Sequence, residues 1–132
     1  MRKNNVAHFE IYANDPKKLG RFYTDLFDWS LDPVPDMDYT LVKTVETDAK
    51  GAASQAGGIN GGLMKRPKGY DTHAWLSYVN VESLDATIER AQKLGARVMK
   101  QRQAVPNMGW FAMLVDIEGN PFAIWQADKA AK

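Results

Sequence analysis

The sequence predicts an α+β fold built from two tandem βαβββ modules, and three observations carry that prediction. Short segments alternate apolar and polar residues, as half-buried β-strands do. Two longer segments repeat apolar residues at helical spacing. The order of these segments is the same in both halves, and the expected helices start at Pro16 and Leu84, roughly 68 residues apart. Two copies at so long a spacing indicate a duplicated module rather than a solenoid.

The first module, at about residues 1–66, is expected to open with a strand in "HFEIYA". Its residues alternate between two faces: His8, Glu10 and Tyr12 on one, and Phe9, Ile11 and Ala13 on the other. The second set has the character of a packing face. A helix follows, with Asp15 as its N-cap and Pro16 at its first position. Its apolar stripe is expected to consist of Leu19, Phe22, Tyr23, Leu26 and Phe27.

Three further strands should complete this module, in "WSLDPV", "YTLVKTVET" and "INGGLMK". The segment "DAKGAASQAGG" between the last two is rich in small residues, which predicts a mobile loop. The glycines around "INGGLMK" weaken the prediction of a strand there.

The second module, at about residues 72–128, repeats this order. "AWLSYVNV" is expected to be a strand, and "SLDATIERAQKLG" a helix that Ser83 caps and Gly95 ends. The strands "ARVMKQRQ", "WFAMLVD" and "PFAIWQ" follow, with a loop in "VPNMG" and a tight hairpin through "IEGN". No disordered linker separates the modules, so we expect residues 1–132 to form a single domain.

The composition excludes several classes of function. Hydrophobic residues make up 45% and charged residues 25% of the chain, as in a soluble globular protein. The formal net charge is +1, so no global field directs the protein to nucleic acid or to a membrane surface. The absence of cysteine excludes disulfides, thiolate metal sites and cysteine nucleophiles. The longest apolar run is too short to span a membrane, and the first ten residues lack the apolar core of a signal peptide, so we expect a cytoplasmic protein.

The two modules resemble the vicinal oxygen chelate superfamily, which includes glyoxalase I, extradiol dioxygenases, fosfomycin-resistance enzymes and bleomycin-resistance proteins. The resemblance rests on "HFEIYANDPKKLGRFYTDLFDW", on "WLSYVNVESLDATIERAQKLGARV" and on the closing hairpin "GWFAMLVDIEGNPFAIWQ". It implies eight strands in two four-stranded sheets that curve into an incomplete eight-stranded barrel, with the site on the concave side and the two helices outside. It also implies a homodimer.

Enzymes of this superfamily hold one divalent metal through four strand positions. Carried over to this chain, the first position is His8 and the second is Gly61, give or take one residue. The third is Leu76, and the fourth, where related strands read "FELWQ", is Ala123 in "FAIWQ". A catalytic site needs about three protein donors, so the resemblance implies that the usual metal is absent. Glu10 lies about 7 Å along the strand from His8, which we expect to be too far for joint chelation.

Three hypotheses remain open for the function. In the leading hypothesis the protein binds a small organic ligand without metal or cofactor. Strand parity puts Tyr78 and Asn80 on the same side as Leu76, and Trp125 on the same side as Ala123. The expected ligand-binding residues are therefore His8, Glu10, Tyr12, Tyr78, Asn80 and Trp125. The rival is a divergent glyoxalase- or dioxygenase-like enzyme, a lyase or oxidoreductase with a non-standard metal site, or a metal-free enzyme with Glu10 or His8 as base. The third is a structural role with a filled barrel. The inward polar and aromatic residues are explained as well by hydrogen bonding and packing within the fold as by contact with a ligand.

Overall fold

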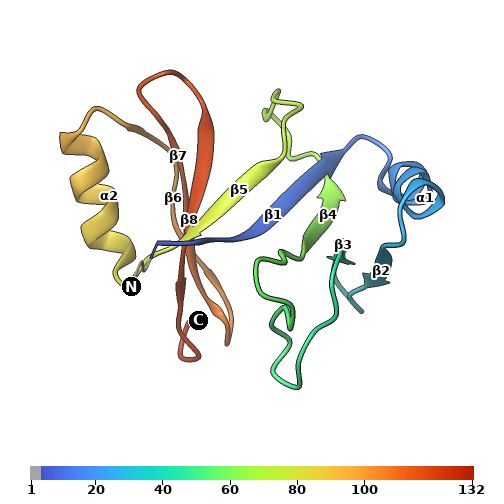
Figure 1. Ribbon diagram of the computed structural model, residues 1–132. Coiled ribbons are helices and arrows are strands. Elements are labelled where there is room, and N and C mark those ends of the chain that lie inside the picture. The colour runs from blue at the N-terminus through green and yellow to red at the C-terminus, as the bar shows by residue number, and fades with distance from the viewer. Residues whose placement is uncertain (1–3) are drawn as a thin grey trace. The chain divides into compact units, whose positions relative to one another are not determined.

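A computed structural model describes residues 4–132 and contains eight strands and two helices (Figure 1). The elements are β1 (Val6–Ala13), α1 (Pro16–Leu26), β2 (Ser30–Pro33), β3 (Tyr39–Lys43), β4 (Gly61–Lys65), β5 (Leu76–Asn80), α2 (Leu84–Lys93), β6 (Arg97–Val105), β7 (Gly109–Val115) and β8 (Pro121–Ala127). One strand, one helix and three strands occur twice in succession. The predicted α+β class and its repeated βαβββ order are confirmed.

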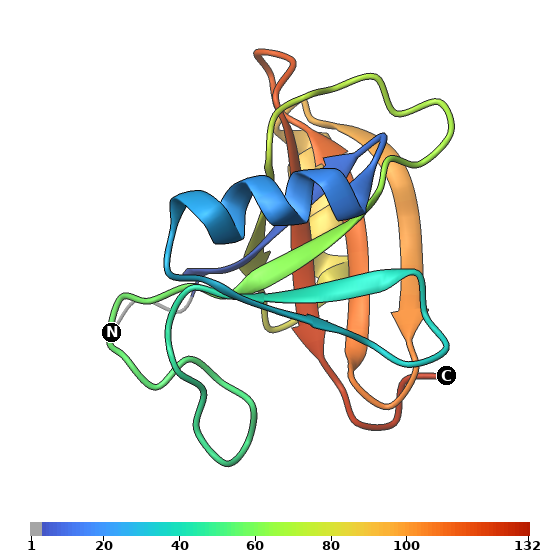
Figure 2. The same cartoon turned by 90° about the vertical axis from the view of Figure 1, so that its right-hand side faces the viewer.

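The described chain divides into two compact units. The first unit is His8–Trp75, and the second unit joins residues 4–7 to residues 76–132. In the first unit the strands lie in the order β2-β3-β4-β1, and in the second in the order β6-β7-β8-β5. One pair of strands in each unit is parallel: β1 with β4 in the first unit and β5 with β8 in the second. The other pairs are antiparallel. In each unit the four strands form an open sheet, and Figure 2 shows α1 lying across the strands of the first unit.

Helix α1 begins as the sequence predicts but buries a narrower stripe. The Oδ1 atom of Asp15 accepts a hydrogen bond from the backbone N–H of Lys18 at 3.2 Å, which satisfies a donor that the first helical turn leaves open. Gly20 is buried, and a Cβ there would lie 2.9 Å from Leu31 Cδ2. The helix therefore packs closely on its sheet at a glycine, and this contact selects which neighbouring side chains reach the core.

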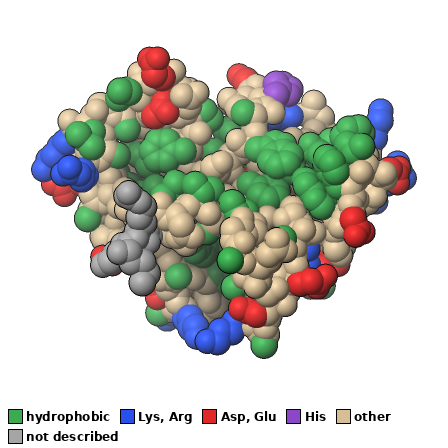
Figure 3. All heavy atoms as spheres, in the orientation of Figure 1, with side chains coloured by type: hydrophobic (Ala, Val, Ile, Leu, Met, Phe, Trp, Pro, Cys, Tyr) green, Lys and Arg blue, Asp and Glu red, His purple; other side chains and the backbone are tan. Residues whose placement is uncertain are grey.

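The expected stripe of α1 is only partly correct. Leu19 and Tyr23 pack against the core of the first unit. Phe22, Leu26 and Phe27 are instead 56%, 57% and 44% exposed. Phe27 lies just beyond the helix in extended conformation, where its ring packs on Tyr23 and Trp29. Figure 3 shows hydrophobic side chains gathered on the surface over α1.

The predicted packing face of β1 is confirmed. Phe9, Ile11 and Ala13 form a buried cluster with Val42 and Leu63 on the side of the sheet that carries α1. Removing such apolar area from water is the main stabilising contribution to a small unit of this kind.

The two glycines of β4 explain why a weak strand sequence forms a buried strand. A Cβ at Gly61 would overlap the ring and carbonyl oxygen of Phe9, its partner in the β1–β4 register. Only glycine lets β1 and the Phe9 ring approach so closely.

Several strand boundaries differ from the prediction, and those of β3 and β6 are two examples. Strand β3 ends at Lys43 rather than at Thr47, because the backbone N–H groups of Thr44 and Val45 donate to the Asn60 side chain at 2.8 and 3.0 Å. Strand β6 continues to Val105, into the segment expected as a loop.

The second unit forms around α2. Ser83 caps the helix by accepting from the N–H of Ala86, and Gly95 follows its end with φ at +103°, as predicted. The buried residues Leu84, Ala112, Leu114 and Ile124 form its core. Among the helices of residues 4–132, neither has the length and apolar character that a bilayer span requires.

Candidate functional site

The candidate site lies on the face of the first unit's sheet that does not carry α1, which we call the helix-free face. Its residues alternate along each strand with those of the buried cluster. The strand register places Glu10 beside Gly62 and Gly62 beside Leu41, and it places Tyr39 beside Met64. The predicted second metal-ligand position therefore moves from Gly61 to Gly62, because Gly61 faces Phe9 in the core.

Three polar side chains meet on this face. His8 Nε2 lies 2.9 Å from Glu10 Oε1, and the hydroxyl of Tyr39 donates to the same oxygen at 2.9 Å. The Tyr39 hydroxyl oxygen also lies 3.3 Å from His8 Nε2. His8 and Glu10, which we expected to be too far apart for joint chelation of a metal, are close enough to hydrogen-bond to each other. Their Cα atoms are separated along the strand, but both side chains lean towards each other across its face.

This network surrounds a buried carboxylate. The Glu10 side chain is 8% exposed and that of His8 33% exposed, so the carboxyl group is the more deeply buried of the two. Burial raises the pKa of Tyr39, and the neighbouring Glu10 charge and the hydrogen bond to Glu10 raise it further. Tyr39 therefore keeps its proton and acts as a donor at physiological pH.

Glu10 is held from one side only. The contacts with His8 and Tyr39 both reach Oε1, while Oε2 is buried and has no hydrogen-bond partner within residues 4–132. Leaving a buried polar atom unpaired is costly, and native proteins contain few of them. A carboxylate in this state is unusual for a face that serves packing alone.

Gly62 makes the network possible. A Cβ at this position would overlap the Tyr39 hydroxyl and would lie 2.7 Å from Glu10 Oε2. The missing side chain gives Tyr39 the room to reach across β4 to Glu10. Any larger residue would have to displace one of the two.

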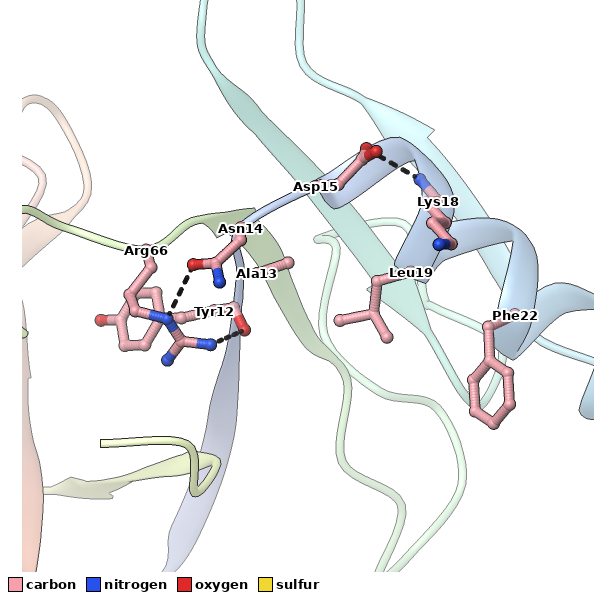
Figure 4. A pocket seen from close by; sticks show the side chains of 8 residues that line it. All are labelled: Tyr12, Ala13, Asn14, Asp15, Lys18, Leu19, Phe22 and Arg66. Atoms are coloured by element: carbon pink, nitrogen blue, oxygen red, sulfur yellow. Dashed lines mark hydrogen bonds between the residues drawn. The ribbon is translucent and has the colours of Figure 1, made fainter. Parts of the chain in front are cut away.

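Tyr12, the third member of the predicted polar row, lies further along β1. Its ring contacts Tyr70 edge to face, with centroids 4.9 Å apart. Tyr12 borders a hollow of about 380 Å³ at the start of α1. Its ring lies on one side of β1, and the side chains of Leu19 and Phe22, which also line the hollow, lie on the other (Figure 4). Arg66 beside it donates to Asn14 Oδ1 and to the carbonyl oxygens of Tyr12 and Thr72, so its guanidinium is engaged within the fold.

A second hollow of about 530 Å³ lies beside α2 and includes Ser83 and Phe122. Neither of these two hollows is lined by His8, Glu10 or Tyr39. The network is therefore a feature of the sheet surface, distinct from both.

The predicted residues of the second unit also lie on one face of their sheet. The β5–β8 register pairs Tyr78 with Ala123 and Asn80 with Trp125. Tyr78 is buried, and its ring centroid lies 6.3 Å from that of Phe111. Asn80 bonds to the start of the chain: its N–H donates to the Asn5 carbonyl, its side-chain amide to Asn5 Oδ1, and its carbonyl accepts from Asn4.

The structure thus joins His8 to Glu10, and it places Tyr78 and Asn80 beside Ala123 and Trp125 respectively. Sequence reasoning missed Tyr39, and it missed the role of Gly62 although its range of one residue around Gly61 included that position. Tyr39 opens a predicted strand, and its parity alone does not show that it faces Glu10. The "GG" pair was the available signal, since a glycine inside a strand often marks the close approach of another group.

The residues at the four inherited metal positions do not fit a divalent ion. Gly62, Leu76 and Ala123 supply no donor atom, and His8 Nε2 is engaged with Glu10. Within the described part of the chain, no three His, Asp, Glu or Cys side chains gather into a group that could hold a metal.

Solved structures share this fold. A glyoxalase/bleomycin resistance protein/dioxygenase superfamily member from Vibrio splendidus matches with a TM-score of 0.63 and 12% identity, over 95% of this chain and 99% of that one. Methylmalonyl-CoA epimerase from Streptomyces coelicolor, solved with 2-nitronate-propionyl-CoA, matches with a TM-score of 0.63 and 14% identity, over 99% of both chains. Identities this low establish the fold alone. The architecture is that of the glyoxalase/bleomycin resistance/dioxygenase superfamily, as the sequence resemblance implied.

Sequence comparison narrows this class. The sequence matches the glyoxalase-like domain over residues 8–125, and the chain belongs to that family. A glyoxylase-like domain-containing protein from Didymella fabae is 28% identical over 120 residues, which cover 90% of this chain and 91% of that protein. The protein named "Putative glyoxylase CFP32" in Mycobacterium tuberculosis is 24% identical over 97% of this chain. The chain spans about half, 48%, of that relative's length.

Proposed function

We propose that this protein binds a small organic molecule on the helix-free face, without the divalent metal that enzymes of the superfamily use. The observation that carries the proposal is the buried carboxylate of Glu10, held by His8 and Tyr39 with one oxygen left unpaired. A buried charge destabilises a fold unless it is fully paired, and well-packed apolar residues are often at least as stable in its place. Ligand recognition gives such a network a reason to persist.

The proposed contacts are those expected from the sequence. On the helix-free face of the first unit they are His8, Glu10 and Tyr12. Tyr78, Asn80 and Trp125, the other residues expected to bind the ligand, belong to one face of the second unit's sheet and are proposed for that unit by itself. The complex of methylmalonyl-CoA epimerase with its acyl-CoA analogue supports the proposal by analogy, because a relative of the same fold holds a small organic ligand. We further propose a cytoplasmic homodimer, which light scattering would contradict by returning the mass of one chain.

A screen of small organic compounds by thermal shift tests the binding. At least one compound should raise the melting temperature, since saturation at 100 times Kd stabilises the folded state by about 2.7 kcal/mol. Glu10→Gln and His8→Ala should abolish that shift. Asp32→Asn is the matched control, because Asp32 is an exposed carboxylate on the same face that pairs with Lys43 at 2.9 Å. If no compound stabilises the protein, the binding proposal is wrong and a purely structural role is favoured.

The same network favours a second candidate, a divergent glyoxalase- or dioxygenase-like enzyme that works by metal-free acid–base chemistry. A buried carboxylate in contact with an imidazole is a suitable pair for moving a proton. Metal analysis of protein purified without chelators separates the metal-free candidates from a lyase or oxidoreductase with an unusual metal site. Stoichiometric Zn, Ni, Mn or Fe that His8→Ala removes would overturn the metal-free proposal.

A further inference from the structure

We propose that a second copy of this chain docks on the outer face of α1, so that the two α1 helices pack side by side in antiparallel orientation. This face consists of four exposed residues that share one side of the helix: Lys18, Phe22, Asp25 and Leu26. The inference rests on the homodimer proposed above and names the surface that forms it.

α1 carries an apolar surface that its own unit does not cover. Four large apolar side chains on or near the helix are between 44% and 57% exposed: Phe22, Leu26, Phe27 and Trp75. Tyr23 connects them, because its ring centroid lies 5.2 Å from that of Phe22 and 6.0 Å from that of Trp75. No segment of the first unit crosses the outer side of α1 in Figure 2. A continuous aromatic surface of this kind is typical of protein–protein interfaces.

The charges of α1 oppose its own dipole. Beyond the N-cap, the first turn carries Lys17 and Lys18 and no acidic residue, and the last turn carries Asp25 and no basic one. A helix dipole favours the opposite order, with acidic residues near the N-terminus and basic residues near the C-terminus. α2 has that favoured order, with Asp85 in its first turn and Lys93 in its last. The charges of α1 therefore do not stabilise the isolated helix.

A second α1 in antiparallel orientation matches these charges. In a symmetric pair, the same surface of both copies forms the interface, so a contact between Lys18 and Asp25 of the partner subunit occurs twice. The basic end of each helix then meets the acidic end of the other, and the two dipoles attract each other as well. A parallel pair would instead place lysine against lysine. Within residues 4–132 neither Lys18 nor Asp25 forms an ion pair, so both are available to a partner.

This pairing also places the apolar residues centrally. When Lys18 lies opposite Asp25 of the partner subunit, the twofold axis passes between Arg21 and Phe22, and the Phe22 rings of the two copies meet there. Leu26 flanks Phe22 on each helix. Apolar anchors at the centre of an interface with charges at its rim are the usual arrangement in stable complexes.

The first experiment measures the dissociation constant of the full chain by sedimentation equilibrium. Phe22→Ser and Leu26→Ser should each weaken the dimer about tenfold or more, as the loss of a central apolar anchor does. Leu94→Ser is the matched control, because Leu94 is an exposed leucine at the end of α2. It should leave the dissociation constant unchanged.

An exchange of charges separates docking from helix stability. Lys18→Glu and Asp25→Lys should each weaken the dimer about fivefold, because each places like charges opposite each other twice. The double variant should recover the affinity of wild type. Each change also agrees with the helix dipole, so at a dilution that dissociates the dimer the variants should melt no lower than wild type. Lys93→Glu on α2 is the charge-matched control and should leave the dissociation constant unchanged.

The second experiment tests the orientation with introduced cysteines, because the chain has none of its own. Chains with Lys18→Cys and chains with Asp25→Cys are mixed and oxidised, and intact mass spectrometry identifies the disulfide-linked pairs. The mixed pair should exceed its share in random pairing. Random proportions, or an excess of like pairs, would overturn the inference.

The possible failures are distinguishable. If the protein has the mass of one chain at every concentration measured, the homodimer and this surface are both wrong, while the thermal-shift screen still decides small-molecule binding. If the protein is a dimer that neither the serine variants nor the charge variants weaken, the homodimer stands, but α1 is not its interface.

Discussion

At equivalent strand positions, the first unit has a pair of polar residues and the second unit has a pair of aromatic residues. In the first unit Glu10 and Tyr39 meet by a hydrogen bond, and Gly62 is the strand neighbour of Glu10. In the second unit Tyr78 and Phe111 meet as tilted rings, and Ala123 is the strand neighbour of Tyr78.

The strand registers make these positions equivalent. Gly62 pairs with Leu41 on β3, as Ala123 pairs with Met113 on β7. Tyr39 and Phe111 are each two residues before those partners. The second unit shows that an aromatic pair beside an alanine is a sound structural solution here. The polar pair and glycine of the first unit are therefore not required by the fold, which is why we connect them with function.

The largest effect should come from Gly62→Ala. The new Cβ would overlap the Tyr39 hydroxyl, so Tyr39 has to leave Glu10, and we expect unfolding free energy to fall by about 2–3 kcal/mol in urea titrations. The reverse change in the second unit, Ala123→Gly, should cost only about 1 kcal/mol. Equal losses at the two positions would show that the glycine has no special role. Adding Tyr39→Leu should recover part of the loss, because it removes the group that collides.

Glu10→Ala should have the next largest effect, about 2 kcal/mol, because it leaves the buried Tyr39 hydroxyl without its acceptor. Glu10→Gln keeps an oxygen at Oε1 and should cost less than half as much. Chemical denaturation of the two variants measures the difference. A Glu10→Ala variant as stable as wild type would mean that the network contributes nothing to the fold.

Tyr39 should make the first unit sensitive to alkali. Its folded-state pKa is raised, first by burial, above the ordinary value near 10. Its contribution to stability is therefore complete below about pH 10 and is lost as pH rises through the folded pKa, by about 1.4 kcal/mol per pH unit. Tyr39→Phe should remove that slope. Wild-type and variant stabilities that fall in parallel above pH 10 would contradict the prediction.

The smallest effect is expected in the second unit and at acid pH. The Trp110 Nε1–H donates to Asp128 Oδ2 at 2.9 Å, and this bond, followed by one from the Ala130 N–H, holds the pKa of Asp128 below its usual range. The associated stability is present above the unfolded pKa and is lost as pH falls through the folded value. Asp128→Asn should flatten this acid dependence slightly, as Trp110 fluorescence would report.

Much of the fold was readable from the sequence because local signals agree with it. The caps Asp15 and Ser83 and the stop at Gly95 all act as predicted, and the alternation in "HFEIYA" assigns the buried face correctly. The stripe on α1 could not be resolved in this way. Helical spacing shows which residues share a side, but the close contact at Gly20 decides which of them reach the core.

The site was only partly predictable for a similar reason. Strand parity placed His8 and Glu10 on one face of β1. The distance between their Cα atoms does not show that their long side chains bend towards each other and form a hydrogen bond. Tyr39 enters from β3, two strands away from β1, and its place depends on two registers at once. Gly62 was noticed as a weakness of a strand, whereas its role is the space that it leaves for Tyr39.

The bonds between Asn80 and the start of the chain bear on any attempt to produce one half alone. Three hydrogen bonds between Asn80 and residues Asn4 and Asn5 hold the end of β5, although Asn4 and Asn5 precede this strand in the chain by the whole of the first unit. A gene fragment that begins at Leu76 would encode all the strands and the helix of the second unit, but Asn80 would lack its hydrogen-bond partners Asn4 and Asn5. A self-sufficient half would have to carry residues 4–7 with it, as an added peptide or as a circularly permuted tail.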